Sequence, residues 1–173
     1  MKRKGLLRRS IAILLFVLPC SEILCAQNPA AIQAAEAACG PQNARFHVEV
    51  APHETPQNAP QGEATVYVIE NAWTRTPTVR IAVDGKWVGA TKGWSYLAVY
   101  VKPGQHHLCI SKQTRSNKLD DNVALAPLLA EAGGEYYFLA DTAGFILPGL
   151  LALEDIDADE GKLLIATRGL AKP

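Results

Sequence analysis

The sequence predicts a mostly β protein, an antiparallel β-sandwich of about seven strands with a short helix before the strands and another after them. Three observations lead to this class. Between residues 64 and 141, short runs rich in β-branched and aromatic residues alternate with turn signals at a spacing of about 8–12 residues. The Asp84-Gly85 pair is a strong hairpin signal, because both positions of such a turn need residues that tolerate positive φ. The two ends instead have helical patterns, at 30–38 and at 158–168.

Residues 1–26 have the pattern of a secretory signal peptide. Five basic residues precede the unbroken apolar run Ile11–Leu18, and we expect cleavage after Ala26. That run is about half as long as the ~20 apolar residues that a transmembrane helix requires. Lipidation at Cys25 is the alternative, but the residue before it is Leu24, where lipidation signals have glycine, alanine or serine. We therefore expect a periplasmic or extracellular protein without lipid and without a transmembrane span in the mature chain.

Cleavage changes the charge balance of the chain. The mature chain keeps 12 basic and 16 acidic residues, a net charge of about −4 before the histidines are counted. No cluster of basic residues remains. Nucleic acid and anionic lipid are therefore not expected as partners.

An N-terminal extension at 27–62 is predicted to precede a β-sandwich domain at 63–173. Its alanine-rich helix ends at Gly40-Pro41, which cannot continue a helix. Residues 45–50 alternate apolar and polar side chains, as an edge or half-buried strand does. Residues 51–62 contain three prolines and no periodicity, which indicates a surface loop or linker.

Two cysteines, Cys39 and Cys109, survive cleavage. An even number of cysteines in an exported chain favours a disulfide, which would join the extension to the β domain. Two buried free thiols are the alternative. Zinc is not expected, because the chain has no Cys-x-x-Cys pair and no spaced set of histidine partners.

The β domain contains seven predicted strands, and their spacing favours a transthyretin-like or immunoglobulin-like architecture. They lie at 64–70, 79–83, 86–90, 94–101, 105–112, 123–130 and 135–141, with a possible short last strand at 150–153. Pro127 suggests that its strand is at an edge or a bulge. Asp157 is a good N-cap for the last helix, and Gly161 is expected to weaken that helix. The connections are predicted at 71–77, 113–122 and 143–149.

Four segments occur in an order that resembles a known bacterial family, the one catalogued as domain of unknown function 2846. They are ATVYVI, VRIAVDGKWVG, GWSYLAVYVKPGQHHL and AEAGGEYYF, and the resemblance covers roughly residues 63–165. It implies an exported β-sandwich domain. It implies no established activity and brings no catalytic residues to this chain.

No catalytic, cofactor-binding or metal-binding residues are predicted. His106 and His107 are adjacent on a strand and point to opposite faces, so they cannot share a metal ion. The acidic stretch at 154–160 lacks the glycine and the spaced glutamate of an EF-hand loop. Neither Ser95 nor Ser111 lies in a Gly-x-Ser-x-Gly frame. We therefore expect no cofactor and no enzymatic activity.

One strand carries an aromatic face. Trp94, Tyr96 and Tyr100 share one side of the strand at 94–101, and aliphatic side chains occupy the other side. If the aliphatic side is core, the aromatic side either packs beneath a helix or is exposed. Exposed aromatic side chains on a sheet suit sugar rings or a partner protein.

These patterns lead to three functional hypotheses. The first is a non-enzymatic cell-envelope module that binds an envelope protein or a glycan through the aromatic face. The second is a structural accessory domain of an envelope assembly, which an exposed apolar patch at 143–151 would favour. The third is a hydrolase, which a pocket holding His106 or His107 beside a carboxylate would favour.

Overall fold

The computed structural model describes residues 29–71, 77–114, 123–142 and 151–173. The predicted signal peptide lies outside the described residues. So do most of the three connections predicted at 71–77, 113–122 and 143–149. Within the described ranges, no helix is long and apolar enough to cross a membrane.

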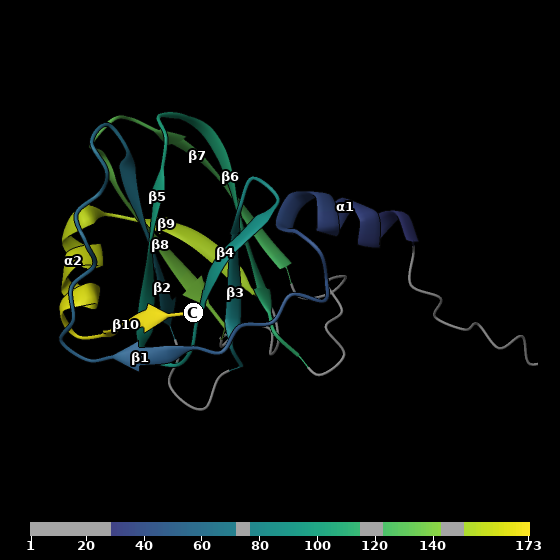
Figure 1. Cartoon of the computed structure of the whole chain (residues 1–173), viewed down its shortest axis with the longest axis horizontal. Coiled ribbons are helices and arrows are strands. Elements are labelled where there is room, and N and C mark those ends of the chain that lie inside the picture. The colour runs from purple at the N-terminus through teal and green to yellow at the C-terminus, as the bar shows by residue number, and fades with distance from the viewer. Residues whose placement is uncertain (1–28, 72–76, 115–122, 143–150) are drawn as a thin grey trace, which may run out of the picture.

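Two β-sheets pack face to face in the described part of the chain (Figure 1). One has six strands in the order β1-β10-β5-β2-β8-β9, and the other has four in the order β4-β3-β6-β7. The elements are α1 (Pro29–Cys39), β1 (Glu49–Ala51), β2 (Ala64–Asn71), β3 (Val79–Val83), β4 (Lys86–Thr91), β5 (Ser95–Val101), β6 (Gly104–Lys112), β7 (Val123–Ala130), β8 (Glu135–Asp141), β9 (Ala152–Ile156), α2 (Ala158–Ala166) and β10 (Gly169–Lys172). The mostly β, sandwich-like class is confirmed, with one helix before the sheets and one near the end.

The prediction of about seven antiparallel strands is wrong in two respects. The described residues form ten strands, and the six-stranded sheet is mixed, because β2 runs parallel to β8 and β10 runs parallel to β5. The three strands beyond the predicted seven, β1, β9 and β10, are only three to five residues long. β1 overlaps the strand pattern at 45–50 and β9 overlaps the last strand considered at 150–153, whereas the sequence predicts no strand at β10, which is too short to give much hydrophobic periodicity. These strands form because distant segments pair, as Glu49 does with Lys172.

The core lies between the two sheets. Val66 and Val68 of β2, Ile81 of β3, Leu108 of β6 and Phe138 of β8 are all buried there. Each alternates with residues that point to the outer face of its sheet, because successive side chains of a strand point to opposite faces. Burial of this apolar surface is the main favourable contribution to folding.

The hairpin between β3 and β4 is present as predicted. Asp84 and Gly85 both have positive φ, 50° and 74°, as a two-residue turn between twisted strands requires. A side chain on Gly85 would clash with the carbonyl oxygen of Ala37, since the end of α1 packs on this turn. The edge position that Pro127 suggests is also confirmed, because β7 is the last strand of its sheet.

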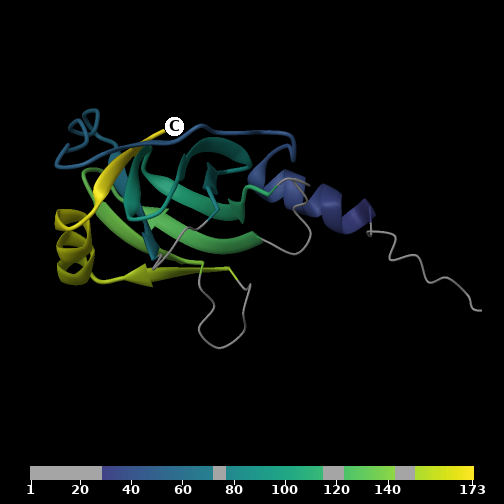
Figure 2. The ribbon, with the colours of Figure 1, turned by 90° about the horizontal axis from the view of Figure 1, so that it is seen from below.

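A disulfide joins the N-terminal extension to the β domain. Cys39, at the end of α1, is bonded to Cys109 of β6, with their Cα atoms 5.3 Å apart. Both residues are fully buried. From this attachment at its C-terminal end, α1 extends away from the sandwich on the side opposite α2 (Figures 1 and 2).

A buried arginine fixes the residues that follow the disulfide. Nη1 of Arg80 donates hydrogen bonds to the carbonyl oxygens of Gln42 and Ala44, at 2.8 and 3.1 Å. Its Nη2 donates to the hydroxyl of Ser111, and its guanidinium lies 4.6 Å from the ring centroid of Trp87. Burial lowers the pKa of Arg80 from its ordinary value. The extension is therefore held to the four-stranded sheet by polar contacts as well as by the disulfide.

The outer face of the six-stranded sheet is covered by α2 and by the segment 52–63, which we call the strap. The hydroxyl of Tyr96 donates to the carbonyl oxygen of Glu54 at 3.3 Å, and the hydroxyl of Tyr100 donates to that of Gln57. Lys172 of β10 forms an ion pair with the carboxylate of Glu54 at 2.6 Å. The strap was predicted as a surface loop or linker, and these three contacts tie it to the sheet.

The second helix packs closely on the same outer face. It begins at Asp157, whose Oδ1 accepts hydrogen bonds from the backbone of Asp159 and Glu160, as an N-cap does. A Cβ on Gly161 would overlap the ring of Tyr137. The glycine that the sequence indicates as a weak point is thus the residue that lets α2 approach the sheet.

Candidate functional site

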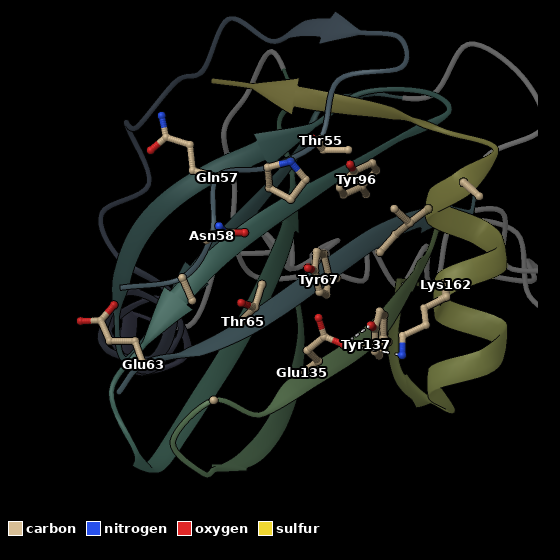
Figure 3. A pocket seen from close by; sticks show the side chains of 15 residues that line it. Thr55, Gln57, Asn58, Glu63, Thr65, Tyr67, Tyr96, Glu135, Tyr137 and Lys162 are labelled. Carbon is tan, nitrogen blue, oxygen red and sulfur yellow. Dashed lines mark hydrogen bonds and ion pairs between the residues drawn. The ribbon is translucent and has the colours of Figure 1, made fainter. Parts of the chain in front are cut away.

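A pocket of about 540 Å³ opens on the outer face of the six-stranded sheet, between the strap and α2 (Figure 3). Side chains from three elements line it. The strap contributes Thr55, Gln57, Asn58 and Glu63, the sheet contributes Thr65, Tyr67, Tyr96, Glu135 and Tyr137, and α2 contributes Lys162, Ile165 and Ala166. Its volume lies within the range of about 300–1,000 Å³ that small-molecule sites occupy.

Three tyrosines stand side by side on the floor of the pocket. Tyr67 stacks on Tyr137, with ring centroids 5.0 Å apart and an interplanar angle of 12°. On its other side, Tyr67 lies next to Tyr96, with ring centroids 6.3 Å apart and an interplanar angle of 55°. The register produces this row, because Tyr67 lies opposite Tyr137 in the parallel β2–β8 pair. Tyr96 and Tyr137 are buried and Tyr67 is half-buried, so the hydroxyl edge of Tyr67 faces the pocket (Figure 3).

The polar groups of the floor are connected in a short chain. The hydroxyl of Tyr137 donates to Oε2 of Glu135 at 3.0 Å, and the ammonium of Lys162 lies 3.7 Å from the same oxygen. Burial and the charge of Glu135 raise the pKa of Tyr67, and burial and the hydrogen bond to Glu135 raise that of Tyr137. These phenols therefore keep their protons at neutral pH. No hydrogen-bond partner for the hydroxyl of Tyr67 is found among the described residues.

A second cavity, of about 330 Å³, adjoins the first. The two cavities share four lining residues, namely Thr55, Tyr96, Ile165 and Ala166. The second cavity is also lined by Arg168, which is 7% exposed and whose guanidinium lies 5.0 Å from the ring centroid of Trp94. Burial lowers the pKa of Arg168, and the charge of Glu70 opposes that effect.

The structure separates the three residues of the predicted aromatic face. Trp94 lies just before β5 and is 51% exposed, against Arg168. Tyr96 is only 1% exposed, and its hydroxyl holds the strap. Tyr100 is half-buried and also holds the strap. Only Tyr96 of the three lines the pocket.

Sequence reasoning missed the residues that contribute most to the pocket floor, which are Tyr67, Glu135 and Tyr137. The alternation of β2 and of β8 places Tyr67 and Tyr137 on the faces opposite the core residues of their strands. That signal was present in the sequence. The parallel pairing that brings the two tyrosines together has no local signal.

His106 is held between two acceptors. Its Nδ1 lies 2.7 Å from Oδ2 of Asp84, and its Nε2 lies 2.7 Å from the carbonyl oxygen of Lys102. The hydrogen bond to Asp84 raises the pKa of His106, and the bond to Lys102 adds to this effect. With both nitrogens donating, this imidazole has no lone pair for general-base catalysis.

His107 is exposed on the other face and lines a separate cavity of about 450 Å³. Asp84 also lines that cavity, so a histidine does lie beside a carboxylate there. The other lining residues are Ala37, Ala38, Gly85 and Leu125, none of which is a nucleophile. In the part of the chain that the structure describes, no group of three or more histidine, cysteine, aspartate or glutamate side chains is arranged to hold a metal ion.

An apolar stripe runs along the edge strand β7. Leu125 and Leu129 are 57% and 65% exposed, and Pro127 between them is also exposed. Their alternate neighbours are buried, so the three side chains lie on one face of the strand. Large exposed apolar side chains grouped in this way mark candidate interaction surfaces.

The fold and the pocket together define a two-sheet β protein that carries a polar, tyrosine-floored cavity outside its core. No known family model matches the chain. A search of curated proteins likewise finds no match.

Proposed function

We propose that this chain is a non-enzymatic binding module exported to the cell envelope, and that it takes its ligand in the pocket between the strap and α2. The single observation that carries the proposal is the hydroxyl of Tyr67. It belongs to a half-buried side chain at the centre of the pocket and lacks a hydrogen-bond partner within the described ranges. This hydroxyl is not among the buried polar atoms that lack a partner, so it is open to solvent and can donate to or accept from a ligand that enters the pocket.

The construction of the pocket supports a binding role. Its floor is rigid, because Tyr96 and Tyr137 are buried and Tyr67 is stacked between them. Its strap wall is anchored to the sheet through Glu54 and Gln57. A preformed site loses little conformational entropy when its ligand binds.

Two observations favour binding over catalysis. The carboxylate of Glu135 already accepts from Tyr137 and pairs with Lys162, so its charge is compensated. Of the two histidines in the hydrolase hypothesis, His106 has both nitrogens engaged. His107 does line a cavity together with Asp84, but none of the other residues lining that cavity is a nucleophile.

Export to the envelope rests on the leader and on the disulfide. The pattern of residues 1–26 is that of a signal peptide. The Cys39–Cys109 disulfide is compatible with an oxidising compartment. Membership of the family catalogued as domain of unknown function 2846 remains part of this proposal, since it rests on the order of sequence segments alone.

The test uses the full chain, secreted with its own leader and purified from the envelope compartment. Binding to the insoluble envelope fraction of the producing cells is measured for the native protein and for Ala166→Trp. Ala166 is an exposed residue that lines both cavities, so a tryptophan there would fill them. The matched control is Ala158→Trp, at the opposite end of α2 and outside both cavities.

We expect Ala166→Trp to lose binding and Ala158→Trp to retain it. Equal binding by both variants, or no binding by the native protein, would remove the basis for a ligand site in this pocket.

A second candidate function is favoured by the apolar stripe of Leu125, Pro127 and Leu129. An exposed stripe on an edge strand suits a structural accessory domain that packs against a partner protein. The double variant Leu125→Glu with Leu129→Glu tests it. Loss of the crosslinked complex in intact cells would favour this function. An unchanged complex would exclude the stripe as the surface that binds the partner protein.

A further inference from the structure

The geometry points to a saccharide as the ligand, and we infer that it is a chain of at least two sugar residues that lies under the strap and spans both cavities. This inference rests on the proposed function, because it names the ligand class of the same pocket. It is carried by the kinds of polar group in the pocket, by the orientation of the tyrosines and by the continuity of the two cavities.

The pocket is lined by a mixture of hydrogen-bond donors and acceptors. Hydroxyls of Thr65 and Tyr67 can donate and accept, the carboxylate of Glu135 accepts, and the side-chain amides of Gln57 and Asn58 do both. Figure 3 shows Thr65, Tyr67 and Glu135 close together on the sheet, with Asn58 of the strap above them and the amide of Gln57 directed away from them. A sugar ring presents hydroxyls that also donate and accept on every side. This match favours a polyhydroxylated ligand over an apolar one.

The orientation of the tyrosines argues against an ammonium ligand. Aromatic sites for ammonium groups use the faces of the rings. Here the two faces of Tyr67 lie against Tyr137 and Tyr96, so its hydroxyl edge is what the pocket presents.

The position of the pocket argues against an extended peptide. Peptides that add to a sheet pair with the free backbone groups of an edge strand. The pocket instead lies over β5, β2 and β8, which are interior strands of the six-stranded sheet. The three floor residues Tyr67, Tyr96 and Tyr137 each pair with a strand on both sides. At the floor, side chains rather than backbone groups are therefore available to the ligand.

The two adjoining cavities point to a chain rather than a single sugar. They have volumes of about 540 and 330 Å³ and meet at Tyr96, whose hydroxyl is already bonded to the strap. One sugar in the larger cavity leaves the smaller one empty. A linear saccharide lying between the strap and α2 reaches both.

Chemical treatment of the envelope fraction tests the ligand class. The native protein and Ala166→Trp are bound to this fraction after periodate oxidation, which cleaves vicinal diols of sugars, or after digestion with proteinase K. We expect the pocket-dependent binding to fall at least ten-fold after periodate and to survive proteinase K. Pocket-dependent binding that survives periodate and disappears after proteinase K would overturn the saccharide inference while the proposed binding function stands. Absence of any pocket-dependent binding would overturn both.

A glycan array with defined probes tests the length of the saccharide that binds and the role of Tyr67. It displays mono- to hexasaccharides of bacterial envelope polysaccharides, and the native protein is expected to bind at least ten-fold more tightly to a chain of three or more residues than to its monosaccharide. Tyr67→Phe should weaken that binding about five-fold, because it removes one hydrogen bond to the ligand. The matched control is Tyr136→Phe, whose hydroxyl accepts from the backbone of Glu131 outside the pocket.

Equal affinity for the monosaccharide and the longer chain would contradict the two-cavity arrangement. Failure of every glycan on the array to bind in a pocket-dependent manner would overturn the inference as a whole.

Discussion

The imidazole of His106 and the carboxylate of Asp84 form an ion pair with a separation of 2.7 Å. Asp84 belongs to the β3–β4 turn and His106 to β6, so the pair ties this turn to the neighbouring strand. The other oxygen of Asp84 accepts from the backbone of His107 at 2.9 Å, which strengthens the attachment. The second nitrogen of His106 donates to the carbonyl oxygen of Lys102, so the geometry favours the protonated imidazolium.

We predict that this pair makes stability depend on pH. The pKa of His106 is raised above its ordinary value of 6.5. The stabilisation is therefore fully present below about pH 6.5 and is lost as the pH rises through the folded-state pKa. His106→Asn should lower the free energy of unfolding by about 1 kcal/mol at pH 5.5, and this difference should shrink as the pH approaches 9. Urea denaturation at a series of pH values measures the effect.

At low pH, protonation of Asp84 removes the stabilisation that its ion pair with His106 provides. Burial alone would raise its pKa, but hydrogen bonds from His106 and from the backbone of His107 lower it overall. Its contribution is lost as the pH falls through that lowered value. The control is His47→Asn, at an exposed position outside this cluster, for which we expect no loss of unfolding free energy at pH 5.5. If His106→Asn lowered the free energy of unfolding by the same amount at pH 5.5 and at pH 9, the ion pair would not be the cause of the pH-dependent stability.

The disulfide is predicted to be a major source of stability. Cys39 and Cys109 are 70 residues apart, and closing a loop of that length removes denatured-state entropy worth about 4 kcal/mol in the chain-entropy model. The double variant Cys39→Ala with Cys109→Ala should lose about that much free energy of unfolding. Thiol labelling of the unfolded, unreduced native protein should find neither cysteine free, and two labelled thiols would refute the bridge.

Arg80 is predicted to hold the residues after the disulfide against the four-stranded sheet. In Arg80→Lys, one ammonium cannot serve Gln42, Ala44 and Ser111 in the arrangement of the guanidinium fork. We expect a loss of about 2 kcal/mol and faster proteolytic cleavage between residues 40 and 46. The control is Lys86→Arg, an exposed position on β4. Cleavage at the native rate in Arg80→Lys would mean that the disulfide alone fixes this segment.

Gly161 is predicted to respond to alanine in the direction opposite to a typical helical glycine. Alanine normally stabilises a helix interior by up to about 1 kcal/mol relative to glycine. Here the added methyl group would overlap the ring of Tyr137, so Gly161→Ala should destabilise the protein by about 1–3 kcal/mol. Leu163→Ala, at a 66% exposed position of the same helix, should change stability by less than about 0.5 kcal/mol. Thermal unfolding compares them, and a more stable Gly161→Ala protein would refute the close packing.

Features with a local signal were predictable from the sequence. The hairpin at Asp84-Gly85 is fixed by two residues that tolerate positive φ, and the edge position of β7 follows from Pro127. The start of α2 follows from its N-cap, Asp157. Each of these depends on residues adjacent in the chain.

Features that depend on distant pairing were not predictable. The parallel β2–β8 pair brings Tyr67 beside Tyr137 across 70 residues of chain, and no motif in either strand specifies it. The strap is held by Tyr96 through a hydrogen bond that spans 42 residues. The sequence suggested an aromatic face at 94–101, but tertiary packing buries Tyr96 beneath the strap and leaves Trp94 exposed against Arg168, while the half-buried Tyr67 of β2 faces the pocket.

Binding of the ligand in the pocket between the strap and α2 can be followed directly by a nuclear magnetic resonance titration. Saccharide chains released from the envelope fraction are added to the isotopically labelled protein, and backbone amide shifts are followed. We expect the shifts to concentrate at Thr65, Tyr67, Glu135 and Lys162, which line the pocket. Shifts confined to the β7 stripe, or no shifts under conditions where the envelope fraction is bound, would contradict it.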